Sequence, residues 1–217
     1  MKKKIYSLFK ALIIILLATT LTALIVSITE RILHQFGYDS IKNKLAANKA
    51  YINEATIVKQ ILIAVIIAPF VEEIIFRLPL NFEKRSIALS ISLMVYRYSG
   101  DGLFTFSTDP IHNWLRFLLT ISAYILTVCF LNSNYLKNLK NKKQKKVYYI
   151  SAIAFGLIHI SNFTPIQWSV FFVYPIYVLP QVIMGLLLAN FRLRYGFLWG
   201  LLLHACLNGI SVILKHL

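Results

Sequence analysis

Long apolar runs recur along the whole chain, with short polar stretches between them. Because a membrane-spanning helix needs about 20 mainly apolar residues, these runs predict transmembrane helices. The expected helices cover residues 8–29, 57–80, 86–98, 113–133, 147–163, 168–190 and 195–214. The helix at 86–98 is short and carries Arg97, so either it crosses the membrane or it dips in and returns. The pattern predicts an all-α fold, a polytopic transmembrane helical bundle of about seven spans, between six and eight.

The composition supports a membrane protein. Of the 217 residues, 58% are hydrophobic and only 14% are charged, too few for the surface of a soluble domain. No linker, repeat or low-complexity stretch divides the chain, so we expect a single membrane domain. Residues 1–56 are expected to form an N-terminal transmembrane helix followed, over residues 30–54, by an amphipathic segment on the outer surface. Residues 57–217 are expected to form the transmembrane core.

The formal net charge is +15, from 23 basic and 8 acidic residues. Most basic residues lie between the apolar runs, as in loops held against anionic lipid, which favours a lipid bilayer as partner and argues against nucleic acid. With seven crossings, most of them fall on the side of the N-terminus, including six lysines of an expected loop at 137–146. This bias predicts a multi-pass plasma-membrane protein with a cytoplasmic N-terminus.

A few polar side chains interrupt the apolar helices. They are Glu72 and Glu73 in the second run, His159 in the fifth, and His204 with Asn208 in the last. Each ionisable group at mid-membrane costs at least ~2.5–3.5 kcal/mol on insertion scales. Residues that carry this cost are therefore the first candidates for function.

Helical spacing organises these side chains. Glu73 and Arg77 are four residues apart, so they share a helix face and can form an ion pair. Glu72 points about 100° away from that pair. Phe155 and His159 repeat the four-residue spacing on another helix.

The last apolar run carries the same spacing. His204 and Asn208 are four residues apart, and Gly200 and Gly196 continue the stripe towards the start of the helix. Small residues in such a track allow a second helix to approach closely.

Depth is an independent criterion. At 1.5 Å per residue, measured from the presumed cytoplasmic end of each helix, Glu72 lies about 13 Å deep, His159 about 18 Å and His204 about 14 Å. Three helices that alternate in direction thus bring polar residues to a similar level. This convergence predicts one buried site.

Such a site suits the activation of water. A carboxylate in a low-dielectric cavity is a plausible general base, and Glu72 is the candidate. Two imidazoles and an amide can hold the water, or donate hydrogen bonds to the oxyanion that forms at a peptide carbonyl. His159, His204 and Glu72 are also a ligand set suited to zinc. A metal-free glutamate mechanism and a metal-assisted one therefore both stay open.

At these residues the sequence resembles the CAAX prenyl endopeptidase and bacteriocin-processing family of intramembrane proteases, known as the CPBP or Abi family. The family pattern has three motifs, in order, on separate membrane helices. All three are intact, as Glu72-Glu73-x-x-x-Arg77, Phe155-x-x-x-His159 and His204-x-x-x-Asn208. The resemblance covers roughly residues 57–214, which makes 57–217 a CPBP-like catalytic core.

The resemblance implies an intramembrane endopeptidase whose substrates are membrane-associated peptides or proteins, cleaved near the cytoplasmic side. It makes Glu72 the base that activates water and gives Glu73 a supporting role through Arg77. Bacterial relatives resemble proteins of bacteriocin processing or self-immunity. Because the chain is small, as compact bacterial members are, we expect substrates other than prenylated CAAX proteins.

The remaining motif residues follow from the same resemblance. His159 and His204 are implied to position the water or to bind a metal. Asn208 is implied to help form the oxyanion site, and Phe155 to shape the cavity.

Two further classes of function are considered. A non-catalytic bacteriocin-immunity or scaffold protein could use the same fold to bind a peptide or a membrane partner. A transporter could use buried Glu and His as a proton relay, but no inverted repeat of spans accompanies the single ionisable cluster. Three intact motifs favour the enzyme. The sequence makes no prediction about oligomeric state.

Overall fold

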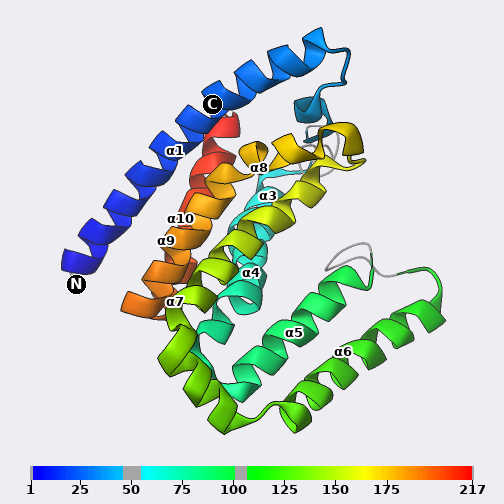
Figure 1. The fold of residues 1–217 in the computed structure, drawn as a ribbon, viewed down its shortest axis with the longest axis vertical. Helices are drawn as coiled ribbons and strands as arrows, with labels where there is room; N and C mark the ends of the chain where they lie inside the picture. The colour runs from blue at the N-terminus through cyan, green and yellow to red at the C-terminus, as the bar shows by residue number, and fades with distance from the viewer. Residues whose placement is uncertain (1, 46–54, 101–106, 217) are drawn as a thin grey trace. The chain divides into compact units, whose positions relative to one another are not determined.

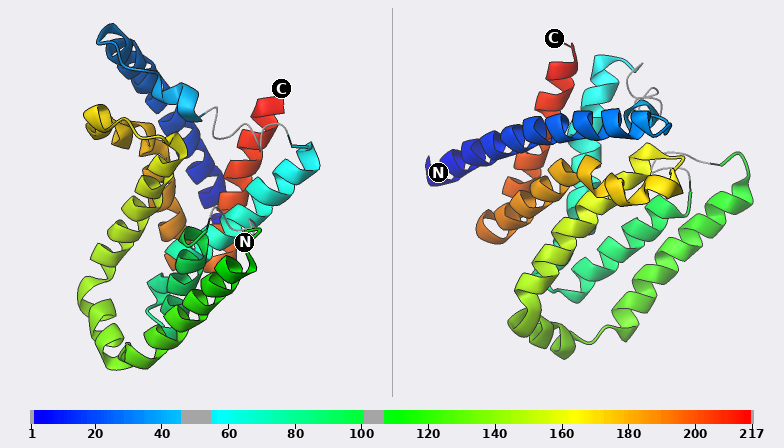
Figure 2. Two further views of the ribbon diagram at one scale, coloured as in Figure 1. Left: turned by 90° about the vertical axis from the view of Figure 1, so that its right-hand side faces the viewer. Right: turned by 45° about the horizontal axis from the view of Figure 1, so that its top comes forward.

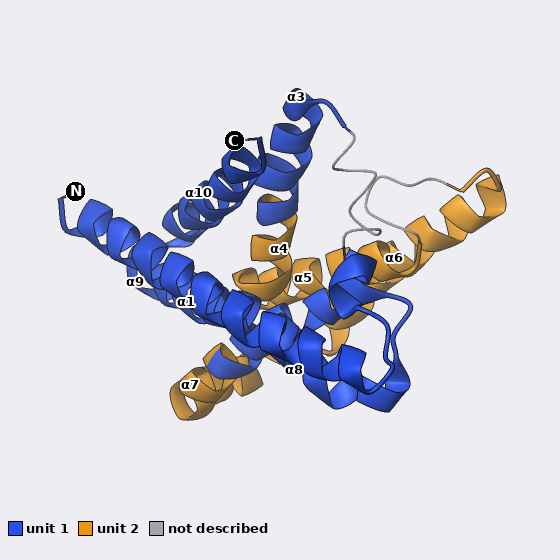
Figure 3. Cartoon of the chain, turned by 90° about the horizontal axis from the view of Figure 1, so that it is seen from above, with its two compact units in different colours: residues 1–69, 149–217 blue, residues 70–148 orange. Residues whose placement is uncertain are grey.

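A computed structural model describes residues 2–45, 55–100 and 107–216, and within these ranges the secondary structure is helical, with no strand (Figure 1). The all-α prediction is confirmed. Contacts along the chain define two compact units, residues 1–69 with 149–217 and residues 70–148 (Figure 3). We call them unit 1 and unit 2 and describe each by itself.

Unit 1 contains most of the helices. They are α1 (Lys2–Gln35), α3 (Ile57–Gln60), the π-helix η1 (Ile61–Ile67), the 3-10 helices η3 (Ile158–Phe163) and η4 (Trp168–Val173), α8 (Tyr174–Tyr177), α9 (Leu179–Tyr195) and α10 (Phe197–His216). The C-terminal part of α7 (Ser133–Leu157) also belongs to it. Helix α10 packs against α9 and η1, and α1 packs against α8, α9 and α10. These contacts build the frame of the polar site.

Two glycines let α7 and α9 approach closely. A Cβ added to Gly156 would lie 2.8 Å from the backbone of Val182, and one added to Gly185 would lie 2.6 Å from the carbonyl oxygen of Ala152. The track predicted at Gly196 is wrong, because Gly196 caps α9 with a φ of +92° and meets no atom there within 4 Å. A backbone position with a positive φ favours glycine, because glycine has no Cβ. Sequence spacing alone does not show whether a glycine is there for its φ or for close helix packing.

The N-terminal segment is partly helical after residue 30. Helix α1 continues to Gln35 and residues 41–45 form a further helical stretch, while residues 46–54 lie outside the described ranges. One Glu30 carboxylate oxygen accepts hydrogen bonds from the Tyr177 hydroxyl (2.7 Å) and the Lys42 backbone N–H (3.0 Å). Ile41 is fully buried in an aromatic core that includes Phe163 and Tyr177. This packing holds the segment against α8.

Unit 2 contains most of α4 (Ala68–Phe76), the 3-10 helix η2 (Leu78–Asn81), α5 (Lys84–Tyr98), α6 (Pro110–Phe130) and the first part of α7. Helices α5 and α6 lie side by side and antiparallel, as the right-hand view of Figure 2 shows. Arg116 of α6 joins them: its Nε donates to the Tyr96 carbonyl oxygen (2.9 Å), and its guanidinium lies 3.8 Å from the centre of the Tyr96 ring.

The loop predicted at 137–146 is wrong, because these residues lie within α7. Lysine, glutamine and leucine are all good helix formers, and the stretch contains no glycine or proline to end a helix. The lysines of this stretch are exposed, so the segment is a solvated basic helix.

The fold has fewer candidate membrane spans among the described residues than the apolar runs predict. Among the described residues, α1, α6 and α10 are long and apolar enough to cross a membrane, and η4–α8 with α9 adds a fourth candidate bent by 45°. Seven spans are not confirmed. The run at 57–80 is helical without a break from residue 57 to residue 76, with the π-helical turns of η1 in its middle, whereas α5 has only 15 residues.

Candidate active site

Two motif histidines pack around one buried ring in unit 1. Phe155 is fully buried, and its ring centre lies 4.9 Å from that of His159 and 5.7 Å from that of His204. Both contacts are edge-to-face, with interplanar angles of 65° and 84°. Such packing restricts ring rotation, so Phe155 sets the orientation of both imidazoles. The structure thus brings together two motifs that lie 45 residues or more apart in the sequence.

The backbone fixes the tautomer of His159. Its Nδ1 lies 2.7 Å from the carbonyl oxygen of Phe155, one helical turn earlier. A carbonyl oxygen only accepts, so Nδ1 carries the proton in this contact and Nε2 carries the lone pair. An imidazole held in this form accepts a hydrogen bond from water or ligates a metal through Nε2.

Pro69 explains the π-helix and the position of Asn208. In η1 the helix is widened, and the N–H of Ala68 bonds to the carbonyl of Ile63, five residues back. In this register the carbonyl of Ala64 points to residue 69, which is proline and has no N–H to donate. The Asn208 side-chain amide takes that place, with Nδ2 donating to the Ala64 oxygen at 2.7 Å. The side chain of Asn208 therefore joins the π-helix to α10. Asn208 is a motif residue, and π-bulges occur frequently at functional sites.

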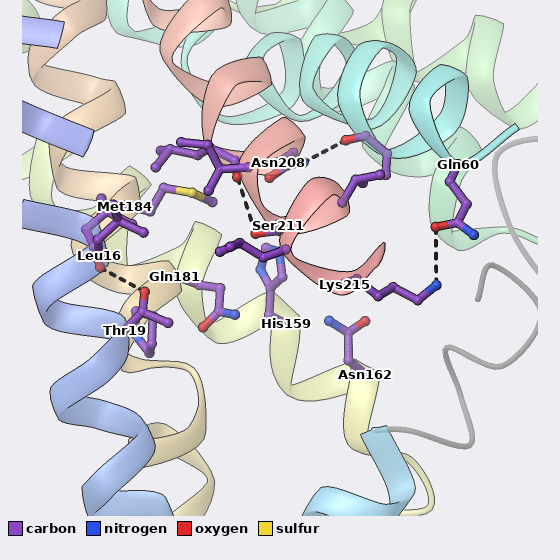
Figure 4. A pocket seen from close by; sticks show the side chains of 17 residues that line it. Leu16, Thr19, Gln60, His159, Asn162, Gln181, Met184, Asn208, Ser211 and Lys215 are labelled. Atoms are coloured by element: carbon purple, nitrogen blue, oxygen red, sulfur yellow. Dashed lines mark hydrogen bonds between the residues drawn. The ribbon is translucent and has the colours of Figure 1, made fainter. Parts of the chain in front are cut away.

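A cavity of about 500 Å³ opens beside these residues in unit 1. Its lining comes from α1, α3, η1, η3, α9 and α10, and Figure 4 shows His159 and Asn208 directed to it. His204, which is only 1% exposed, is not among the lining residues. His159 and Asn208 thus line the cavity, while His204 packs against the Phe155 ring.

The cavity lining includes further polar side chains that sequence reasoning missed, among them Gln60, Gln181 and Lys215. Gln181 has a buried side-chain oxygen that accepts no hydrogen bond. Gln60, only 2% exposed, accepts hydrogen bonds from Lys215 (Nζ, 3.2 Å) and His216 (Nε2, 3.1 Å). Each amide interrupts an apolar run, the signal that identified the histidines. Their meeting depends on tertiary structure, which spacing along one helix does not predict.

The carboxylate motif lies in unit 2, on α4. Glu73 and Arg77 form the predicted ion pair, with 3.7 Å between Oε1 and Nε, and both side chains are fully buried. Glu72 is half-buried, and its carboxylate also interacts electrostatically with Arg77, although less strongly than Glu73 does. The arginine therefore acts on both carboxylates, while only Glu72 keeps partial exposure.

The predicted site residues thus form two sets. Phe155, His159, His204 and Asn208 are together in unit 1, and Glu72, Glu73 and Arg77 are together in unit 2. The meeting of the two sets stays a prediction. Within the described ranges, no three His, Cys, Asp or Glu side chains stand close enough to hold a metal ion. The zinc site predicted from both sets likewise stays a prediction.

The fold and the two sets of motif residues define the class of protein. It is a helical membrane protein whose apolar helices carry the Glu, His and Asn side chains that hydrolases commonly use. Residues 54–210 match the family model described as type II CAAX prenyl endopeptidase Rce1-like. The match covers more than half of the chain, so the protein belongs to this family of CAAX-type intramembrane endopeptidases, within the CPBP group. No curated protein and no solved structure matches the chain.

Proposed function

We propose that this protein is an intramembrane endopeptidase that hydrolyses peptide bonds of membrane-associated peptides or proteins near the cytoplasmic side of the plasma membrane. The observation that carries the proposal is the pair of histidines packed on Phe155, inside a region that matches a protease family and keeps all three motifs. His204 is buried and His159 is half-buried, and each imidazole costs free energy on an apolar helix, so a role in chemistry gives a reason for both to be there.

The proposed reaction is attack by water on a peptide carbonyl. Glu72 removes a proton from the water as its oxygen adds to the carbonyl carbon. The same carboxyl then gives the proton to the leaving amine as the C–N bond breaks. Glu73 is not well suited to this task, because its buried ion pair with Arg77 already holds it. Its proposed role is to fix Arg77 and, through it, the local electrostatics of Glu72.

The histidines and Asn208 supply positioning and charge stabilisation in this proposal. His159 offers Nε2 to the water, while His204 packs edge-to-face with the Phe155 ring that orients His159. Asn208 uses one N–H for Ala64, and the second N–H of the same amide is the proposed donor to the oxyanion. Zinc held by His159, His204 and Glu72 is the alternative means of activating water, and a chelator separates the two mechanisms.

The cavity of unit 1 is the proposed seat of the substrate. Its volume falls in the range of roughly 300–1,000 Å³ that is usual for ligand sites. The unsatisfied oxygen of Gln181 would accept a backbone N–H of an extended peptide. Lys215 adds a cation near Gln60, and the described residues that line the cavity include no carboxylate, which suits a substrate segment without basic side chains.

Peptide cleavage by the full-length protein in liposomes tests the proposal. The substrates are membrane-associated peptides offered with and without a prenyl group, so that the family's CAAX type and other peptides are compared directly. We expect cleavage by the wild type, and none by Glu72→Gln or His159→Gln at matched folding. Glu83→Gln and His112→Gln are controls, because both residues are exposed and lie outside the motifs.

The competing function is peptide binding without cleavage, as in a bacteriocin-immunity or scaffold protein. The polar cavity would serve it equally well. In that case no peptide is cut, the wild type still protects cells against a bacteriocin, and Glu72→Gln protects as well as the wild type. Such a result would replace the enzymatic proposal.

A further inference from the structure

A second concavity lies in unit 2, and no residue of the three motifs lines it. It is a groove of about 540 Å³ between the first turns of α5 and α7. Lys84 and Arg85 line it from α5, and Lys137 and Ser133 line it from α7. Three cations from two helices therefore converge on one small volume.

The single acid in the lining is already engaged. Oε2 of Glu83 accepts a hydrogen bond from the Ser86 hydroxyl at 3.5 Å, and the Glu83 backbone N–H donates to Asn81 at 2.8 Å. These contacts hold Glu83 at the start of its own helix. The lining keeps a net positive charge, which complements a phosphate group.

The groove also has an apolar side. Phe82 is 7% exposed and Leu136 is 3% exposed, and Val128 of α6 completes the lining. Helix α6 is long and apolar enough to cross a membrane and ends at Phe130, two residues beyond Val128. The groove therefore lies at the level where a membrane span ends, which is where lipid headgroups are found.

We propose that this groove binds the headgroup of an anionic phospholipid, with its phosphate held by Lys84, Arg85 and Lys137 and its glycerol region against Phe82 and Leu136. Basic pockets between transmembrane helices are suited to such headgroups. The amphipathic lining selects a lipid over a free phosphate ion, because an ion would gain nothing from the apolar side. The lipid then stabilises the junction between α5 and α7.

Lipid binding to the full-length protein in a neutral detergent tests the proposal. Fluorescent phosphatidylglycerol is titrated into the wild type, the triple variant Lys84→Gln/Arg85→Gln/Lys137→Gln and a matched triple variant Lys142→Gln/Lys143→Gln/Lys145→Gln. The matched variant removes the same charge from an exposed part of α7 that does not line the groove. Each basic residue near an anionic surface contributes roughly a fivefold gain, so the groove variant should bind about a hundredfold more weakly.

The matched variant should bind almost as the wild type does, and phosphatidylcholine should bind weakly to all three proteins. Equal losses in both triple variants, or none in either, would overturn the proposal. Competition by soluble glycerophosphoglycerol as strong as by the intact lipid would show a free phosphate site and overturn the lipid assignment. The single change Lys137→Glu, at an exposed position, repeats the test if the groove variant does not fold. It should also weaken binding.

Discussion

The side-chain amide of Asn208 donates a hydrogen bond to the backbone carbonyl of Ala64 at 2.7 Å. In the π-helical register the backbone N–H of residue 69 would donate to this carbonyl, but residue 69 is proline and has no N–H. A motif residue of the last helix therefore completes the hydrogen bonding of a helix 144 residues away. This contact fixes one N–H of the Asn208 amide in unit 1.

The Asn208→Leu variant should lose about 1–3 kcal/mol of stability, because it leaves the Ala64 oxygen without a donor. Pro69→Ala restores an N–H at residue 69, so the cost of Asn208→Leu should be smaller in the Pro69→Ala background. The free energy of unfolding is measured in mild detergent for the wild type, both single variants and the double variant. The four values give the coupling free energy between residues 69 and 208. Additive costs would show that Pro69 and Asn208 act independently.

Phe155→Leu should reduce cleavage by about tenfold to a hundredfold, because small misplacements of catalytic groups have effects of this size. The loss should appear in kcat, since the Phe155 ring orients His159 and His204 but does not line the cavity. Phe172→Leu is the control, at a ring that is 77% exposed. A rise in KM with unchanged kcat would assign Phe155 to substrate binding instead.

Gln181→Leu should raise KM with little change in kcat. The variant removes the unsatisfied oxygen proposed to accept a substrate N–H, and an interaction made equally in ground and transition states affects KM alone. Steady-state kinetics on one peptide substrate measure both constants. Gln144→Leu, on an exposed part of α7, provides the control. An unchanged KM would remove Gln181 from the substrate site.

Glu73→Gln should destabilise the protein strongly, by about 3–5 kcal/mol, because the buried Arg77 loses its nearest counter-charge. Glu72→Gln should cost much less, since Glu72 is half-buried and interacts less strongly with Arg77. Thermal unfolding of both variants in the same detergent compares them directly. Equal destabilisation would contradict the division into one structural and one catalytic carboxylate.

Apolar runs correctly predicted a helical fold for the described residues, because a backbone inside lipid must satisfy its own hydrogen bonds, but only three or four of the helices are long and apolar enough to cross a membrane. Four-residue spacing also predicted the pairs Glu73–Arg77 and Phe155–His159, both of which are in contact. The Lys-rich helix at 137–146 was missed because polarity suggested a loop, although its residues favour a helix.

Features that depend on tertiary contacts were not predictable in the same way. Proline at residue 69 leaves a helix carbonyl without a donor, but the sequence does not indicate that Asn208 supplies one. The cavity residues Gln60, Gln181 and Lys215 come from different helices, so no local pattern joins them. The shared depth of Glu72, His159 and His204 remains a prediction that enzymatic measurements can test.

The most direct test of the central claim is the rate at which one membrane-associated peptide is cut by the wild type and by Glu72→Gln, at matched folding and with or without a chelator. The account predicts cleavage by the wild type and a loss of at least about a hundredfold in Glu72→Gln, the usual contribution of a general base. Inhibition by the chelator would select the metal-assisted mechanism, and full activity with chelator the metal-free one. Equal cleavage by both proteins would contradict the role of Glu72.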